Sequence, residues 1–182
     1  MIEGVAWHDY VALNDVLGVP GLRMWYCEGA LELMTTSPLH ERLKTTIARL
    51  VELYAFLTGL RLNGYGSATF RAEAKERGAE PDECYVVGGT LVDFPEIVLE
   101  VVLTSGGIDK LEIYAGLGVR EVWFYEKDAF HLYELGEHGY RAIEMSALVP
   151  GLDFEALARF ARIEDQHEAL AALQAWLRER SG

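Results

Sequence analysis

The sequence has little of what proteins use for covalent cross-links or membrane insertion. Its 182 residues include two cysteines, Cys27 and Cys84, which are too few for a disulfide framework and lack the CxxC spacing of a zinc site. Its longest apolar runs fall far short of the ~18 residues that a membrane helix requires. Residues 1–4 show no basic stretch followed by an apolar one, so no signal peptide is visible. We therefore expect a soluble cytoplasmic protein with no membrane contact.

Basic residues are also scarce. Lysine and arginine number 16 against 29 aspartates and glutamates, which gives a net charge of −13 at pH 7. The acidic excess is present in both halves of the chain, and no cluster of lysine or arginine offsets it. A charge of this sign repels polyphosphates at long range, so composition alone counts against nucleic acid as a partner.

Hydrophobic residues make up 51 % of the chain and charged residues 25 %, which excludes disordered, collagen-like and coiled-coil proteins. The chain is long enough to bury a sizeable core without disulfides or metal. No repeat or linker divides it, so we predict one domain over residues 1–182.

The first third of the chain predicts a helix, a hairpin and a second helix. We expect a short helix over 8–17 and a β-hairpin with strands 22–27 and 30–34 separated by Glu28-Gly29. Ser37-Pro38 predicts the start of the longest helix, with the serine as N-cap and the proline at the first helical position. Apolar residues at three- and four-residue spacing give this helix one apolar face, and Gly59 ends it.

The remainder of the chain is richer in strands. The run 97–103 is almost wholly apolar, which predicts a central strand buried on both faces. Helices are expected over 108–117 and 165–180. Other strands are expected over 60–65, 68–72, 83–87, 121–125 and 130–134, with an edge strand over 139–145. The predicted class is α/β or α+β, with a mixed β-sheet flanked by helices.

Glu100 departs from its apolar surroundings in the predicted central strand. An ionised carboxylate there is costly unless it is paired or bound to a metal. Asp82 follows Pro81 at the start of the preceding strand, so two adjacent strands place carboxylates near one edge of the sheet. Such a pair forms a site for a hard divalent cation. The alternatives for Glu100 are a strand-end residue facing solvent and a carboxylate paired with an arginine.

Lys110 begins the next predicted helix, where its ammonium can reach back over that edge. Asp82, Glu100 and Lys110 occur with several short motifs in a characteristic order. Together they resemble the Uma-two family of restriction-endonuclease-like proteins, a branch of the PD-(D/E)XK nuclease superfamily, over residues 9–156. The motifs are Glu28-Gly29 with Leu31-Glu32-Leu33-Met34, Ser37-Pro38 with His40, Pro81-Asp82, Glu96-Ile97-Val98-Leu99-Glu100-Val101, Lys110-Leu111-Glu112-Ile113-Tyr114, Gly118-Val119-Arg120-Glu121-Val122-Trp123 and Leu148-Val149-Pro150-Gly151-Leu152.

The resemblance implies a restriction-endonuclease-like core with Asp82 and Glu100 as ligands of Mg²⁺ or Mn²⁺. In the superfamily a lysine usually stands two residues after the acid, where this chain has Val102. The family carries its lysine in the following helix, and Lys110 matches that position. A lysine there orients the attacking water and balances charge in the transition state. The implied reaction is hydrolysis of phosphodiester bonds in nucleic acid, with DNA favoured over RNA.

The chain departs from the family between Glu100 and Lys110. The family usually has a longer polar loop there, often rich in arginine, serine and proline, whereas residues 101–109 carry no basic side chain. This difference weakens binding to a phosphate backbone more than it weakens metal binding. Two functions therefore stay open: a metal-dependent endonuclease, and a catalytically inactive nuclease-fold module that acts by binding or regulation.

Other residues have both a functional and a structural interpretation. His40, in the first turn of the long helix, can orient a water or a phosphate, or simply cap and pack the helix. Glu41 or Glu32 can complete a metal shell, or lie on a solvated helix face and a hairpin edge. The run Trp123-Phe124-Tyr125 is interpreted as strand packing rather than a base-stacking platform. The remaining histidines share no ligand spacing, which excludes a zinc site: His8, His131, His138 and His167.

The last predicted helix has an apolar stripe of Leu170, Leu173 and Leu177, with Trp176 beside it. Something must cover this stripe. It either packs back on the domain or forms a homodimer, which would give a nuclease two sites for two strands.

Overall fold

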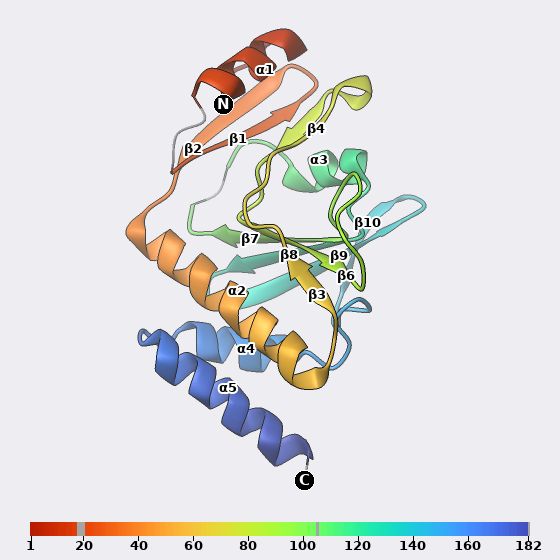
Figure 1. The fold of residues 1–182 in the computed structure, drawn as a ribbon. Helices are drawn as coiled ribbons and strands as arrows, with labels where there is room; N and C mark the ends of the chain where they lie inside the picture. The colour runs from red at the N-terminus through yellow and green to blue at the C-terminus, as the bar shows by residue number, and fades with distance from the viewer. Residues whose placement is uncertain (18–20, 105, 182) are drawn as a thin grey trace.

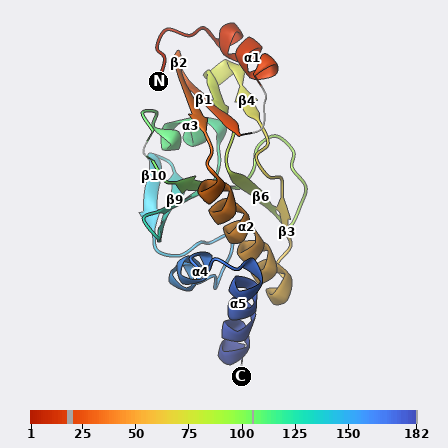
Figure 2. The ribbon, with the colours of Figure 1, turned by 90° about the vertical axis from the view of Figure 1, so that its left-hand side faces the viewer.

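The computed structural model describes residues 1–17, 21–104 and 106–181. These residues form two β-sheets with helices between and below them, and the two ends of the chain lie at opposite ends of the molecule (Figures 1 and 2). From the N-terminal end, the layers are helix α1, the smaller sheet, helix α3, the larger sheet, helices α2 and α4, and helix α5.

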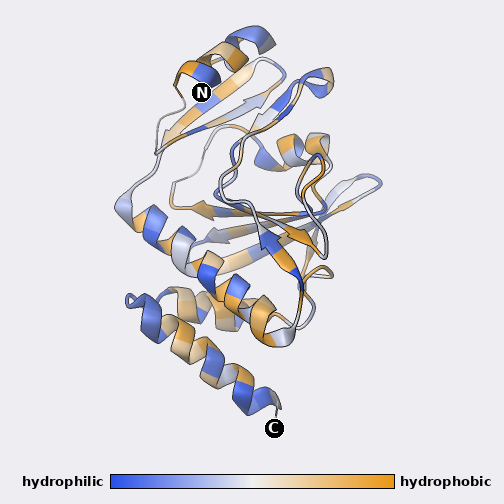
Figure 3. Ribbon diagram, in the orientation of Figure 1, coloured by the Kyte–Doolittle hydropathy of each residue, from blue (hydrophilic) through white to orange (hydrophobic). Residues whose placement is uncertain are grey.

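The larger sheet has six strands in the order β10-β9-β8-β7-β6-β3. β7 and β8 are parallel and all other neighbours are antiparallel, so the sheet is mixed, as predicted. The first five residues of β7 are buried, and Figure 3 shows this strand as strongly apolar, which confirms the central strand. The strands are β3 Leu62–Gly64, β6 Glu83–Val87, β7 Ile97–Val102, β8 Glu121–Glu126, β9 Ala129–Gly136 and β10 Gly139–Ile143.

The smaller sheet contains the predicted N-terminal hairpin. Glu28 and Gly29, with φ of 44° and 91°, form the turn between its strands, as expected for a two-residue hairpin loop. α1 (Trp7–Val16) packs on this sheet through Tyr10, whose ring stacks on Tyr26. The strand order is β2-β1-β5-β4, all antiparallel, with β1 Leu22–Cys27, β2 Ala30–Thr35, β4 Phe70–Ala72 and β5 Arg77–Ala79.

Three helices cover the two faces of the larger sheet. α3 (Lys110–Leu117) fills the space between the two sheets. The short 3-10 turn η1 (Glu73–Lys75) joins β4 to β5 in the smaller sheet. α2 (Pro38–Thr58) packs on the other face together with α4 (Phe154–Ala161). Because both faces of β7 are covered, its side chains are removed from water in both directions.

Local capping sets the ends of the two helices nearest the acidic residues. Ser37 Oγ accepts a hydrogen bond from the His40 N–H, Pro38 opens α2, and Gly59 ends it with φ of 75°, all as predicted. α3 starts two residues later than expected. Asp109 caps it by accepting from the Leu111 N–H at 2.9 Å, so Lys110 is the first helical residue.

The second sheet was not predicted, nor were β5 and α4. β5 has three residues and is stabilised by pairing with β1 and β4. The sequence of such a short segment, which contains Gly78, gives no local signal of this pairing. Gly78 is required because a Cβ there would lie 2.2 Å from the Tyr10 hydroxyl oxygen. α4 did carry a local signal, since Asp153 caps it and its apolar residues recur at helical spacing.

The C-terminal helix α5 (Gln166–Ser181) packs within the chain, on α2 and α4. Leu173 is buried, and Leu170, Trp176 and Leu177 are partly buried against the core. The predicted apolar stripe is therefore accounted for without a second copy of the chain. Within the described residues, no helix is both long and apolar enough to cross a membrane.

Candidate active site

Glu100 lies at the centre of the larger sheet and is 0 % exposed. Along β7 the side chains alternate between the sheet faces, so Leu99 and Val101 join the core under α2, whereas Val98 joins the core around α3. Glu100 shares the α3 face with Val98. The solvent-facing alternative for Glu100 is therefore wrong, and its carboxylate requires partners within the protein.

The strand register places Asp82 opposite Glu100, as predicted. Glu83 of β6 pairs with Leu99 of β7 in antiparallel register, so the preceding residue, Asp82, lies beside Glu100. Asp82 is 2 % exposed, and its Oδ2 accepts from the Val101 N–H at 2.8 Å. The two carboxylates are thus held on neighbouring strands by backbone geometry.

Lys110 is the cation that faces this pair. Its Nζ donates to Glu100 Oε2 at 2.9 Å and lies 3.7 Å from the centroid of the Trp25 ring. Trp25 comes from β1 of the smaller sheet, so both sheets contribute to the surroundings of the ammonium. The Glu100 partner is therefore a lysine rather than the arginine considered as an alternative.

Tyr114, one turn after Lys110 on α3, was missed in the sequence. Its hydroxyl donates a short hydrogen bond to Glu100 Oε1, and burial raises the pKa of this hydroxyl well above its usual value. The i,i+4 spacing of Lys110 and Tyr114 places both on one helix face, which is the signal that could have found it.

Burial raises the pKa of Glu100 above its ordinary 4.5, opposed by the charge of Lys110 and reinforced by the charge of Asp82. The site therefore favours the protonated, neutral form of Glu100 more strongly than water does. A second cation placed between the two carboxylates would relieve the same repulsion.

His40 contacts the acidic pair from the first turn of α2. Its Nε2 lies 3.0 Å from Asp82 Oδ2. Burial disfavours the charged ring, but the hydrogen bond to Asp82 and its charge outweigh burial and raise the pKa of His40 above 6.5. Because α2 begins at Pro38, the His40 ring lies in its first turn, where it can donate a hydrogen bond to Asp82.

Glu41 flanks His40 and is turned away from the acidic pair. Its Oε1 lies 3.5 Å from His40 Nδ1, and its Oε2 accepts from Lys44 Nζ at 2.6 Å. Burial raises the pKa of Glu41, but Lys44 outweighs it, and the pKa lies below the ordinary value. Glu41 thus lies beside His40, which in turn contacts Asp82.

The chain matches the family model Uma2, described as "Putative restriction endonuclease", over residues 7–163. This match covers most of the chain and contains the residues 9–156 that carry the resemblance. The chain belongs to the Uma2 family. It is also similar to a solved structure from Anabaena variabilis ATCC 29413, described as a "putative nuclease belonging to DUF820", with 11 % identity and a TM-score of 0.49 over 88 % of this chain and 98 % of that chain. No curated protein matches the sequence.

Glu32 of this Uma2 chain does not lie on a solvated hairpin edge, which was one of its two interpretations. It is buried, with 6 % exposure, and its Oε2 accepts from the N–H groups of Gly107 at 2.9 Å and Ile108 at 2.8 Å. It is therefore not a solvated hairpin edge. Glu32 ties strand β2 to the segment that leads from β7 into α3; Ser105, in the same segment, lies outside the described residues.

Other candidate ligands of the Uma2 chain do not gather. His8 pairs with its exposed neighbour Asp9, and in residues 1–17, 21–104 and 106–181 no group of three or more His, Cys, Asp or Glu side chains has metal-site geometry. Cys27 and Cys84 are free thiols. Asp82 and Glu100 are two carboxylates and are likewise not part of such a group of three.

Proposed function

We propose that this Uma2 chain hydrolyses phosphodiester bonds in nucleic acid, with DNA favoured over RNA, and that Asp82 and Glu100 bind the Mg²⁺ or Mn²⁺ it needs. One observation carries the proposal. The β6–β7 register sets Asp82 beside the buried Glu100, and Lys110 Nζ reaches Glu100 from α3 in a chain of a restriction-endonuclease-like family.

The donor chemistry of the acidic pair fits Mg²⁺. This ion binds hard oxygen ligands and commonly takes only one or two carboxylates from the protein, with waters and substrate phosphate oxygens in its other positions. Asp82 and Glu100 supply two carboxylates whose mutual repulsion helps to raise the pKa of Glu100. A bound divalent ion lowers the pKa of a coordinated water and offsets charge on the phosphate.

The protein side chains would position and balance that chemistry. The Val101 N–H and His40 hold Asp82 at one oxygen. Lys110 has three N–H donors, one of which is used by Glu100, so its ammonium can also donate to a phosphate oxygen. The Trp25 ring forms one wall beside the ammonium and limits where it can move.

A nuclease-fold module without turnover is the second candidate. Both oxygens of Glu100 are already held, by Lys110 and Tyr114, and the residue is fully buried. A net charge of −13 and the lack of basic residues over 101–109 weaken the hold on a phosphate backbone. These features favour a role in binding or regulation if cleavage is absent.

The test combines metal binding with cleavage. Calorimetric titration with Mg²⁺ and Mn²⁺ should give binding to the parent protein and none to Asp82→Asn, and cleavage of plasmid and single-stranded DNA should fall at least about 100-fold in that variant. Glu83→Gln is the matched control because it removes the neighbouring carboxylate, which accepts from the Cys84 N–H. A parent that binds no metal and cleaves neither substrate would leave the inactive module.

Assembly and location belong to the same proposal. A homodimer, which the covered stripe of α5 no longer requires, would give the two strands of a duplex one site each. Light scattering near twice the 20.4 kDa of one chain would support it, and a value near 20.4 kDa would exclude it. We place the protein in the cytoplasm, where Cys27 and Cys84 remain reduced thiols.

A further inference from the structure

A small pocket beside α3 shares Lys110 with the acidic pair, since Lys110 lines the pocket and donates to Glu100. Its volume is about 260 Å³, and Lys110 is one of its lining residues. We call it the Phe124 pocket. Its apolar lining includes Met34, Val101, Val102, Ile108, Leu111 and Phe124, and the polar side chains of Thr104, Asp109, Lys110 and Glu126 also line it.

The strand register explains why the Phe124 pocket lies beside the acids. Glu100 of β7 is paired with Phe124 of β8, and Val102 is paired with Glu126, so these four side chains face the same side of the sheet. Phe124 is therefore the cross-strand neighbour of Glu100. A group seated against Phe124 is next to whatever the acidic pair and Lys110 hold.

Phe124 behaves differently from the residues on either side of it. Trp123 and Tyr125 are buried in the core under α2, which confirms their interpretation as packing residues. Phe124 is only half-buried and faces the pocket, with Tyr133 against it in an edge-on arrangement at 5.9 Å between ring centroids. Phe124 therefore packs against the core around α3, as interpreted, and in addition lines the pocket.

The size and lining of the pocket favour a single flat apolar ring. Its volume lies just below the roughly 300–1,000 Å³ of pockets for drug-sized ligands. The two carboxylates among its lining residues have partners: Asp109 caps α3, and Glu126 Oε1 pairs with Lys127 Nζ at 3.1 Å. The wall thus offers an aromatic face and aliphatic side chains, which is the environment of an unstacked nucleobase.

We infer that the Phe124 pocket receives one unpaired nucleobase next to the phosphate at the acidic pair, so that the substrate is a strand with unstacked nucleotides rather than an intact duplex. This inference rests on the proposed function and specifies its substrate. A base inside a duplex is paired and stacked and cannot enter the pocket unless it is extruded. Contact with a base also supplies affinity that the acidic surface and the 101–109 segment do not.

The test measures binding rather than cleavage, in the Asp82→Asn background with EDTA, by fluorescence anisotropy of labelled oligonucleotides. The probes are a single strand, the same strand with abasic sites and the matched duplex. We expect the normal strand to bind about 5- to 100-fold more tightly than the abasic strand, which corresponds to one stacked base. Phe124→Leu should remove most of that difference in affinity and leave the affinity for the abasic strand unchanged.

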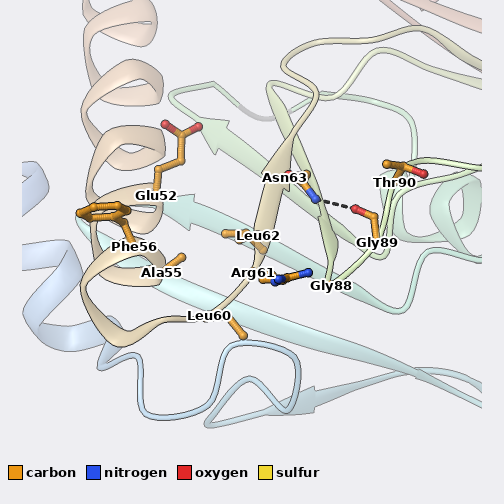
Figure 4. A pocket seen from close by; sticks show the side chains of 10 residues that line it. All are labelled: Glu52, Ala55, Phe56, Leu60, Arg61, Leu62, Asn63, Gly88, Gly89 and Thr90. Carbon is orange, nitrogen blue, oxygen red and sulfur yellow. Dashed lines mark hydrogen bonds between the residues drawn. The ribbon is translucent and has the colours of Figure 1, made fainter.

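Phe56→Leu is the matched control. Phe56 is 81 % exposed and lines a wider hollow of about 580 Å³ at the far end of α2, together with Glu52, Arg61 and Asn63 (Figure 4). None of the acidic-pair residues lines that hollow. This substitution should change none of the three affinities, whereas an equal loss in both variants would overturn the inference.

Equal binding of normal and abasic strands, or a duplex bound as tightly as the single strand, would also overturn the inference. Failure of the proposed function gives a different result. The parent protein could cleave nothing and still show base-dependent binding that Phe124→Leu removes. That result would support the base-binding pocket and contradict the proposed hydrolysis. A parent that cleaves duplex and single strands equally, with no base-dependent binding, would support the proposed hydrolysis and contradict the base-binding pocket.

Discussion

Two buried glutamates on adjacent strands of the larger sheet are held in opposite ways. Glu121 opens β8 and is 1 % exposed, while Glu100 lies in β7 and is 0 % exposed. Among the described residues, the groups that donate hydrogen bonds to the Glu121 carboxylate are neutral. They are the Trp123 Nε1–H at 2.9 Å, the Ser146 hydroxyl at 2.6 Å, and the N–H groups of Ala147 at 2.9 Å and Leu148 at 3.2 Å.

Glu100 instead stands between charges of both signs. Lys110 and Tyr114 donate to it, while the carboxylate of Asp82 repels it from the next strand. The Glu121 arrangement satisfies a buried carboxylate completely and anchors the 146–149 segment, so it is a structural solution. The Glu100 arrangement leaves a repulsion between two carboxylates, which the proposed divalent ion would relieve.

The largest expected difference is in cleavage. Glu100→Gln should reduce cleavage at least about 100-fold, because the amide cannot replace an anionic metal ligand. Glu121→Gln should leave the rate per folded molecule unchanged and lower the free energy of unfolding by about 2–4 kcal/mol, because the new NH₂ faces donors. Time courses on plasmid DNA and urea unfolding measure the two effects. If Glu100→Gln cleaves like the parent, Glu100 is structural in the same sense as Glu121.

The next effect concerns the cation. Lys110→Met keeps an apolar stem near Trp25 but leaves Glu100 without its ammonium, which should cost about 3 kcal/mol of unfolding free energy in EDTA. Millimolar Mg²⁺ should restore part of this loss because it neutralises the same carboxylates.

Lys44→Met is the control for that measurement. Lys44 pairs with the partly exposed Glu41, so its loss should cost at most about 1 kcal/mol and should not respond to Mg²⁺. A Lys110→Met protein whose melting temperature stays equally low with and without Mg²⁺ would count against a metal at the acidic pair.

Stability in EDTA should also depend on pH through two groups, Glu100 and His40. The folded-state pKa of Glu100 is raised above 4.5, so the folded protein retains this proton to higher pH than the unfolded chain does. Its stabilising contribution is therefore complete below pH 4.5 and is lost as pH rises through the folded pKa. The pKa of His40 is raised above 6.5, so its contribution is complete below pH 6.5 and is lost above it.

Each of these pH windows has a slope of at most about 1.4 kcal/mol per pH unit for one group. The measurement is urea unfolding of the parent, Glu100→Gln and His40→Gln across pH 4–9. The difference in unfolding free energy between the parent and each variant isolates the pH-dependent contribution of the replaced residue. A parent-minus-variant difference that increases with pH would reverse the sign and contradict the arrangement.

The smallest effects come from removing one hydroxyl at each glutamate. Tyr114→Phe and Ser146→Ala should each lower the free energy of unfolding by about 1–2 kcal/mol. Only Tyr114→Phe should also move the Glu100 window to higher pH, since its hydroxyl stabilises the ionised carboxylate. An identical pH profile in both variants would show that the two sites do not differ in the way described.

Much of the fold was predictable wherever a local signal existed. The Ser37-Pro38 start and Gly59 end of α2, the Glu28-Gly29 turn and the apolar run of β7 each depend on residues within a few positions of one another. Asp82 and Glu100 were also predictable as neighbours, because successive strands that pair bring their ends together. What lacked a local signal, such as the three-residue β5 and the division into two sheets, depends on partners distant in sequence.

The sequence by itself determined that Glu100 lies in a buried strand, that Asp82 precedes it at the start of the neighbouring strand and that Lys110 follows it at the start of a helix. Only the tertiary structure decided what each carboxylate faces. Packing of α3 between the sheets aims Tyr114 at Glu100, and the β7–β8 register makes Phe124 its neighbour. Segment 106–108 folds back so that Glu32 caps its N–H groups. The physical reason is that a side chain's direction follows from local periodicity, whereas its partner depends on which distant surfaces must be buried together.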